Sequence, residues 1–366
     1  MAGETSTSEG LKGEVLAALG RVLDPELGRD IVSLGFVQDL AVGDGAVSFT
    51  IELTTPACPL KEQIKTQAEA AALSVPGVKS VDITLTARTS NPATSRQRAL
   101  PGVSHIIAVA SGKGGVGKST ISVNLAVALA AAGAKAGILD ADVYGPSIPK
   151  MMGLQPASLR ARGGRIYPIE QYGVKVMSLG LMVEEDAAVI WRGPLLARAV
   201  GQMLREVEWG ELDYLVVDLP PGTGDVPLTL AQLVPVSGVV VVATPQEVAL
   251  RIAAKAATMF QRLGVPVLGV VQNMSTFICP HCRKETPIFN SAGKDAAKEL
   301  GIEPLGSIPL DGQIVADGDE GSPTVAVHPD SPQAEAFRKM ASAVAARMSV
   351  VTRSETDRLK AMGQNL

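Results

Sequence analysis

The sequence has few cysteines, no long apolar run and no secretory signal. Three cysteines among 366 residues are too few for a disulfide framework, so we expect free thiols or metal ligands in a reducing compartment. The apolar runs at 125–132 and 238–243 are much shorter than the about 18 residues that cross a bilayer. The first residues lack the basic and apolar segments of a signal peptide. We therefore expect a cytoplasmic protein without a membrane partner.

Aromatic residues and excess charge of one sign are also scarce. Aromatics make up 3% of the chain, and 33 Lys and Arg residues face 37 Asp and Glu residues, for a net charge of -4. This balance gives no general attraction for nucleic acid, so we expect no nucleic-acid partner. Apolar residues reach 46%, which is typical of an α/β protein whose parallel strands are buried on both faces.

The first part of the chain predicts a small α-β-β-α-β domain over residues 8–88. Helical spacing of apolar residues is followed by two strand-like stretches around a Gly-Asp-Gly turn, then by a second helix and a third strand. The expected elements are a helix at 11–23, strands at 35–42 and 46–53, a helix at 59–73 and a strand at 78–85. Residues 89–103, with Ser, Thr, Pro and scattered Arg, are expected to be an exposed linker.

Residues 104–350 alternate between short apolar strands and longer helical stretches. This order predicts an α/β domain with a mainly parallel sheet, right-handed crossovers and helices on both faces. The clearest expected elements are strands at 106–110, 135–140, 214–218, 238–244 and 265–271, and helices at 118–132, 248–263 and 331–348. The tail at 351–366 is mixed in charge, and we expect it to fray.

The most informative motif lies between the first of these strands and the following helix. It fits the phosphate-loop pattern G-x-x-x-x-G-K-[ST] at every fixed position. Its residues are Gly112, Lys113, Gly114, Gly115, Val116, Gly117, Lys118, Ser119 and Thr120. Glycines let the backbone fold around phosphates, and the N–H groups at the helix start attract them. Lys118 is expected to reach the β- and γ-phosphates of a nucleoside triphosphate, and Ser119 to hold Mg²⁺.

Acidic residues at two other strand ends complete the expected nucleotide site. Asp140 and Asp142 follow the strand after the phosphate-loop helix, and Asp218 ends a later strand. Carboxyl ends of neighbouring parallel strands meet at one edge of the sheet, where carboxylates can serve the metal and the attacking water. Asp218 suits the outer-shell Mg²⁺ role, whereas strand-end capping is the alternative for Asp140 and Asp142. Lys113 is outside the generic pattern and poorly placed for the γ-phosphate of its own chain.

The segments K-G-G-V-G-K-S-T, D-A-D-V-Y-G-P-S and D-L-P-P-G-T-G-D resemble the deviant-Walker ATPases related to MinD and ParA. The resemblance implies that Lys113 contacts ATP bound to a partner subunit, and hence a nucleotide-sandwich homodimer. It further implies that Asp142 positions the attacking water, that residues 218–225 form a second switch, and that Asn273 recognises adenine. Lys113, Lys118 and Asp142 would then be the catalytic groups. A turn residue is the alternative for Asn273, because asparagine is common in turns.

Cys279 and Cys282 form a C-x-x-C pair in a loop after a strand end. Two thiolates can bind one face of a soft metal or a cluster, but a closed site needs four ligands. In a symmetric dimer the same loop of the partner would raise the number of thiolates to four, at a site shared across the two-fold axis. The alternatives are a redox pair, a degraded zinc knuckle and a structural zinc bridge, since four thiolates also suit zinc.

Residues 273–282 and 189–194 resemble the Mrp/ApbC branch of these ATPases, the iron-sulfur cluster carrier proteins. This resemblance implies a [4Fe-4S] cluster held between two subunits by Cys279 and Cys282 of each. It also implies transfer of the cluster to apo iron-sulfur proteins and slow ATP hydrolysis coupled to cluster loading or release. Upstream scaffold proteins are the further partners that the resemblance implies.

Residues 24–27 and 54–59 resemble a small domain of iron-sulfur assembly factors that is often fused to Mrp proteins. Pro59 is expected at the first helical position, which would place Cys58 at the N-cap, where the helix dipole favours the thiolate. Cys58 would then be a transient cluster ligand or a thiol that faces client proteins. The alternative is a small buried apolar side chain, as free cysteine often is.

Two other classes of ATP-dependent protein fit the motifs less well. A positioning ATPase of the MinD/ParA type would need an amphipathic, basic C-terminal helix or a basic stripe, and residues 354–360 offer neither. An electron donor related to nitrogenase reductase would use widely separated single cysteines instead of a C-x-x-C pair.

Overall fold

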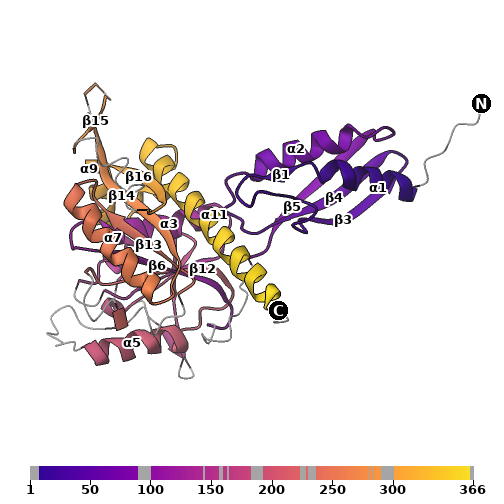
Figure 1. Cartoon of the computed structure of the whole chain (residues 1–366). Helices are drawn as coiled ribbons and strands as arrows, with labels where there is room; N and C mark the ends of the chain where they lie inside the picture. Colours follow the sequence, from indigo (N-terminus) through magenta and orange to yellow (C-terminus); the bar gives the residue numbers. More distant parts are fainter. Residues whose placement is uncertain are drawn as a thin grey trace, which may run out of the picture. The chain divides into compact units, whose positions relative to one another are not determined.

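The structure, a computed structural model, covers most of the chain. It describes residues 8–89, 100–142, 145–155, 160–162, 165–182, 193–222, 228–229, 236–279, 281–282, 284–289 and 301–362. The chain divides into two units, Met1–Ser90 and Asn91–Leu366. Figure 1 shows the helices and strands of both. In the described ranges, no helix is long and apolar enough to cross a membrane.

The first unit is a three-stranded sheet packed against two helices. Its elements are α1 (Ser8–Leu19), β1 (Leu23–Asp24), β2 (Arg29–Asp30), β3 (Val37–Gly43), β4 (Ala46–Leu53), α2 (Lys61–Leu73) and β5 (Ser80–Ala87). Strand β4 lies in the middle, antiparallel to β3 and parallel to β5. Asp44 and Gly45 join β3 to β4 with φ of 51° and 83°, the left-handed conformation that a tight hairpin requires. The predicted helix and strand order is confirmed, with the short β1–β2 pair added.

A nine-stranded, mostly parallel sheet forms the centre of the second unit. Its strands run in the order β10-β11-β7-β12-β6-β13-β14, and both β15 and β16 pair with β14. Among the described strands of this sheet, β10 with β11 and β14 with β15 pair antiparallel, and the other pairs are parallel. The strands are β6 (Val103–Ser111), β7 (Ala136–Asp140), β10 (Ile169–Gln171), β11 (Val174–Ser178), β12 (Leu212–Asp218), β13 (Gly238–Ala243), β14 (Val267–Ile278), β15 (Glu285–Pro287) and β16 (Pro304–Leu310), with β8 (Arg160–Arg162) and β9 (Arg165–Tyr167) as a separate pair.

Helices cover both faces of this sheet, which explains why its central strands are apolar throughout. The helices are α3 (Lys118–Ala131), α4 (Ile148–Met151), α5 (Gly193–Glu206), α7 (Glu247–Arg262), α9 (Gly312–Glu320), α10 (Thr324–Val327) and α11 (Pro332–Ala361), with a 3₁₀ turn, η2, at Leu179–Leu181. Ile106 and Ala108 of β6 share a core with Met203 of α5 and Phe260 of α7. The side chain of Ile107 points to the opposite face, because successive residues of a strand alternate. The predicted fold class is confirmed.

Two segments differ from expectation. The tail expected to fray from residue 351 continues α11 as far as Ala361, so that expectation is wrong over 351–361. Within this extension, Nε of Arg353 lies 3.6 Å from Oδ1 of Asp357, one turn later, a pair of the kind that supports a helix by a few tenths of a kcal/mol. Strand β14, expected to end near residue 271, continues to Ile278, because its last residues pair with β15 and with the end of β16. This extension carries β14 from its parallel pairing with β13 and β16 to the cysteine pair.

Candidate functional site

The phosphate loop connects β6 to α3 and has glycine where another residue would collide. Gly117 stands at the N-cap of α3 with a φ of 80°. A Cβ atom there would lie 2.1 Å from Nδ2 of Asn273, and one at Gly112 would lie 2.4 Å from Cγ2 of Ile252 on α7. The glycines therefore let the loop backbone lie close to both β14 and α7, in the strand-loop-helix arrangement that the motif requires.

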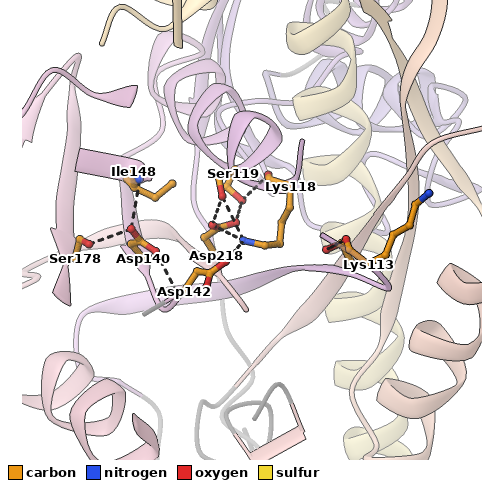
Figure 2. Close-up of polar contacts among 10 residues, drawn as sticks. Lys113, Lys118, Ser119, Asp140, Asp142, Ile148, Ser178 and Asp218 are labelled. Atoms are coloured by element: carbon orange, nitrogen blue, oxygen red, sulfur yellow. Dashed lines mark hydrogen bonds and ion pairs between the residues drawn. The ribbon is translucent and has the colours of Figure 1, made fainter. Parts of the chain in front are cut away.

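Lys118 meets two of the three expected carboxylates, those of Asp142 and Asp218, at the start of α3 (Figure 2). Nζ of Lys118 lies 2.6 Å from Oδ2 of Asp218 and 3.6 Å from Oδ2 of Asp142. The hydroxyl of Ser119 donates a hydrogen bond of 2.7 Å to the same Oδ2 of Asp218. Asp218 is fully buried and Lys118 is 6% exposed, so this ion pair is shielded from water. The structure thus brings together the lysine, the hydroxyl and two carboxylates that the motifs singled out.

Ser122 is a further member of this cluster that the sequence analysis missed. Its hydroxyl donates a 2.5 Å hydrogen bond to Oδ1 of Asp218, the carboxylate oxygen that Lys118 and Ser119 leave free. The side chain is fully buried. Residue 122 follows Lys118 by four positions on α3, so both lie on one helix face, and this spacing could have identified it. Both oxygens of Asp218 are therefore held in place.

Asp140 is directed to α4 and not to Lys118 (Figure 2). Its Oδ2 accepts hydrogen bonds from the Ser178 hydroxyl at 3.0 Å and from the Ile148 backbone N–H at 3.3 Å. Burial, and then the charge of Asp218, raise the pKa of Asp140 well above its usual range. This geometry supports the capping interpretation, because Asp140 ties the end of β7 to the first residue of α4. Ser178, on β11 beside β7, has no signal in the local sequence.

Lys113 lies apart from the cluster around Lys118, and its side chain points away from it (Figure 2). Its Nζ lies 3.3 Å from Oε1 of Gln246, the residue that precedes α7. This pair of side chains is exposed to solvent. Lys113 is therefore not one of the groups that surround Lys118. Nothing in the local sequence identifies Gln246 as the neighbour of Lys113.

Asn273 borders both the phosphate loop and a small pocket. Its Nδ2 donates a 2.8 Å hydrogen bond to the carbonyl oxygen of Val116. The pocket has a volume of about 120 Å³, and its lining is mainly apolar but includes the acidic residues Asp311 and Asp319. Its wall includes Gly117, Thr120, Asn273, Met274, Pro309 and Ile314. A flat apolar ring with polar edges is the kind of group that such a lining accommodates.

The hairpin of β14 and β15 extends beyond the main body of the sheet (Figure 1). Cys279 and Cys282 lie in its loop, after the end of β14 at Ile278. The backbone N–H of Cys279 donates to the carbonyl of Lys284 at 3.1 Å, which closes the loop. Cys279 is half-buried and Cys282 is exposed. Hydrogen bonds from the Cys282 backbone, the His281 backbone and the Cys282 thiol lower the pKa of Cys279. Within the described ranges no three His, Cys, Asp or Glu side chains gather as a metal site, so the loop offers two thiols per chain.

Cys58 does not lie at a helix N-cap, and the expectation that it would is wrong. Helix α2 begins at Lys61, and its N-cap is Leu60. Thr55 explains the late start: its hydroxyl accepts the backbone N–H of Ala57, and its carbonyl accepts that of Cys58, so these residues form a turn. Cys58 is 7% exposed, and burial raises the pKa of its thiol to about 11. Cys58 is therefore a small buried side chain of the core, as the alternative to a cluster ligand predicted.

Several expected features lie outside the described residues. They are part of the second switch, residues 223–225, and most of the 189–194 segment, of which only the backbone of residues 193 and 194 is described.

The fold and the cluster around Lys118 define a P-loop NTPase. A family model described as "NUBPL iron-transfer P-loop NTPase" matches residues 102–345, and one described as "Iron-sulfur cluster assembly protein" matches residues 12–85. The iron-sulfur cluster carrier proteins of Deinococcus radiodurans and Escherichia coli are 48% and 43% identical to this chain. The matches span 93% and 94% of this chain and 97% and 94% of those proteins, respectively. The chain belongs to the family of iron-sulfur cluster carrier proteins, which confirms the resemblance seen in its motifs.

Solved structures agree with this assignment. A nucleotide-binding protein from Archaeoglobus fulgidus, in complex with ADP, matches with a TM-score of 0.56 and 40% identity over 64% of this chain and 91% of that one. The cell division ATPase MinD of Pyrococcus furiosus matches with a TM-score of 0.51 and 26% identity, over 66% of this chain and 98% of that one. These neighbours confirm the MinD/ParA-like fold of the second unit.

Proposed function

We propose that this chain binds and slowly hydrolyses ATP, carries a [4Fe-4S] cluster at a homodimer interface, and transfers that cluster to apo-proteins in the cytoplasm. The observation that carries the proposal is the Cys279–Cys282 pair on an exposed hairpin, continuous with the strand that borders the nucleotide pocket. Family membership supports it, because the relatives are named as cluster carriers. Upstream scaffold proteins would supply the cluster.

The oxygen donors beside Lys118 fit a magnesium ion. The hydroxyl of Ser119 and the carboxylate of Asp218 lie 2.7 Å apart, and Mg²⁺ prefers hard oxygen ligands. These two residues would hold the ion, directly and through water, and the ion would neutralise charge on the β- and γ-phosphates when bound. Ser122 would keep Asp218 in the orientation that this role requires, since its hydroxyl already holds Oδ1.

The other charged groups of the site would have separate roles in binding and hydrolysing the triphosphate. Lys118 would neutralise the β- and γ-phosphates from its place at the start of α3, where the backbone N–H groups also face the phosphates. Asp142 lies 3.6 Å from Lys118 and would orient the attacking water. Asp140 would contribute to the nucleotide site indirectly, by holding α4 in place, because its carboxylate accepts a hydrogen bond from the first residue of that helix. Hydrolysis would be slow and coupled to cluster loading or release.

The pocket beside Asn273 would take the adenine ring. Its walls are mainly apolar, and the amide of Asn273 can both donate to and accept from the edge of a purine. The same amide donates a hydrogen bond to the Val116 carbonyl, so the residue that recognises adenine would also be linked to the phosphate loop. The Archaeoglobus fulgidus neighbour, whose structure contains ADP, supports a nucleotide in this fold.

Two copies of the chain would complete the cluster site. Each supplies the thiols of Cys279 and Cys282, and a [4Fe-4S] cluster takes four. A two-fold dimer brings identical loops together, and Lys113, whose side chain is exposed, would contact the partner's nucleotide. The lowered pKa of Cys279 favours the thiolate that binds iron.

Anaerobic reconstitution with iron and sulfide, followed by sedimentation, tests this proposal. A dimer with about two irons and two sulfides per chain, and broad absorption at the blue edge of the visible range, would support a shared cluster. A colourless dimer with about half a zinc per chain would contradict it and indicate a structural metal bridge.

A further inference from the structure

Strand β14 joins the pocket beside Asn273 to the cysteine hairpin. Asn273 and Met274 line the pocket, and the same strand ends at Ile278, one residue before Cys279. The connection is covalent and short. Any change in the path of β14 between Asn273 and Ile278 therefore changes where the cysteines lie.

The path of β14 is irregular within this connection. Asn273 pairs with Ile308 of β16, and the next pair is Phe277 with Leu310. The three β14 residues 274–276 therefore stand opposite the single residue Pro309 of β16. This is a bulge with two extra residues, and bulges bend a strand and redirect the segment that follows them. Pro309 and Leu310 also line the pocket, so the bulge and its partner strand form one of the pocket walls.

Met274 gives this bulge an unusual backbone. Its φ is 57°, in the left-handed region that methionine rarely adopts. Such conformations persist where surrounding contacts enforce them, and they are found at switch regions. Met274 lines the pocket, and the Ser275 hydroxyl holds the bulge to β16 by donating a hydrogen bond of 3.1 Å to the Ile308 carbonyl. The bulge is thus a strained segment that borders the pocket and is tied to β16.

We propose that the bulge at residues 274–276 couples the nucleotide pocket to the cysteine hairpin. A base in the pocket packs against Met274, fixes the left-handed conformation and so holds the hairpin in one orientation; when the pocket empties, the bulge relaxes and the hairpin moves. The inference rests on the proposed binding of ATP, but on neither hydrolysis nor the cluster. It gives a physical route by which nucleotide controls access to Cys279 and Cys282.

Hydrogen exchange of the full chain, without a cluster, tests this coupling. Amide exchange at Thr276, Phe277 and Ile278 is measured with and without saturating ATP, and ATP affinity is measured separately. Saturating ATP is expected to slow exchange at these amides by about fivefold or more in the wild type, within the range of typical coupling between sites. Slower exchange follows because a fixed bulge keeps the β14–β15 pairs closed.

Two variants separate the bulge from the pocket. Met274→Gly removes the backbone restraint, because glycine adopts positive and negative φ with similar ease. Ser275→Ala removes the hydroxyl that holds Ile308, and Ser275 is not among the residues that line the pocket. Asp44→Gly is the matched control, since Asp44 also has a positive φ, of 51°, but lies in the first unit. The two bulge variants are expected to lose most of the response at saturating ATP, and Asp44→Gly to keep it.

The outcomes distinguish this inference from the proposed function. If ATP binds the wild type but leaves hairpin exchange unchanged, or if Met274→Gly and Ser275→Ala respond as the wild type does, the coupling is wrong and the proposed function stands. If the wild type does not bind ATP, the proposed function fails and the coupling fails with it. A response that is lost in both bulge variants and kept in Asp44→Gly establishes the coupling.

Discussion

The two units each contain a Cys-Pro dipeptide, Cys58-Pro59 and Cys279-Pro280, and the two cysteines have opposite properties. Cys58 lies in the core of the first unit, where burial raises the pKa of its thiol to about 11. Cys279 lies in a hairpin loop, where hydrogen bonds from Cys282 and His281 lower its pKa. The same two residues therefore give a packed apolar group in one place and a thiolate donor in the other. Burial and backbone hydrogen bonds decide the chemistry of a cysteine.

Replacing both loop cysteines gives the largest effect that this comparison predicts. Cys279→Ala with Cys282→Ala should reduce the iron bound after reconstitution to background, because each chain then has no thiol at the proposed site. Cys58→Ala should bind as much iron as the wild type. Iron and sulfide counts on gel-filtered protein make the measurement, with circular dichroism to confirm that each variant is folded. Full iron in the double variant would place the site elsewhere.

Alkylation at controlled pH compares the two cysteines directly. A pKa of about 11 leaves roughly one Cys58 thiol in a thousand ionised at pH 8, so iodoacetamide should modify it very slowly in the native protein. Cys279, with its lowered pKa, should react rapidly at the same pH. Because the raised pKa delays ionisation, the rate at Cys58 should climb only as pH rises toward 11. Mass spectrometry of the labelled peptides reports both rates, and equal rates at pH 8 would refute the contrast.

Replacing the phosphate-loop lysine should impair ATP hydrolysis without impairing iron binding by the thiols. Lys118→Ala should lower ATP hydrolysis by at least about a hundredfold, since one charged group that stabilises the reacting phosphates is lost. Iron binding at Cys279 and Cys282 should stay unchanged. Lys339→Ala is the control, because that lysine is 77% exposed on α11. Phosphate release and iron counts measure the two effects, and a variant that hydrolyses ATP normally would exclude the proposed role of Lys118.

The smallest effect is expected at Ser122. Ser122→Ala removes a hydrogen bond to a buried carboxylate, which is worth about 1.5–3 kcal/mol, or roughly tenfold or more in rate. The loss should appear as weaker apparent Mg²⁺ affinity, and added Mg²⁺ should restore much of the activity if Ser122 positions Asp218. Ser349→Ala, at another buried helical serine, is the control. A loss that no concentration of Mg²⁺ relieves would indicate a structural role instead.

The sequence predicts features that depend on local spacing. The phosphate loop, the α/β order and the C-x-x-C pair can all be identified in this way, and the cluster of Lys118, Ser119 and Asp218 follows from the rule that parallel strands end at one edge. Ser122 could also have been identified, four residues after Lys118. These features need few assumptions about the rest of the fold.

Features that depend on particular side-chain contacts or on strand register escaped prediction. Ser178 meets Asp140 only because β11 pairs with β7. Cys58 was expected at a helix N-cap, but Thr55 forms a turn that moves the start of α2 to Lys61. The bulge at Met274 has no signal at all, because methionine has no preference for a left-handed backbone. The register between β14 and β16 produces the bulge, and nothing in the local sequence of either strand specifies that register.

Transfer of the cluster tests the central claim most directly. The reconstituted chain is mixed under anaerobic conditions with an apo-enzyme that needs a [4Fe-4S] cluster, and the recovered activity is followed together with the loss of absorbance from the carrier. The account predicts that enzyme activity returns as the carrier loses its cluster. The variant with both Cys279→Ala and Cys282→Ala should restore no more activity than free iron and sulfide do. An apo-enzyme that stays inactive while the cluster remains on the carrier would contradict it.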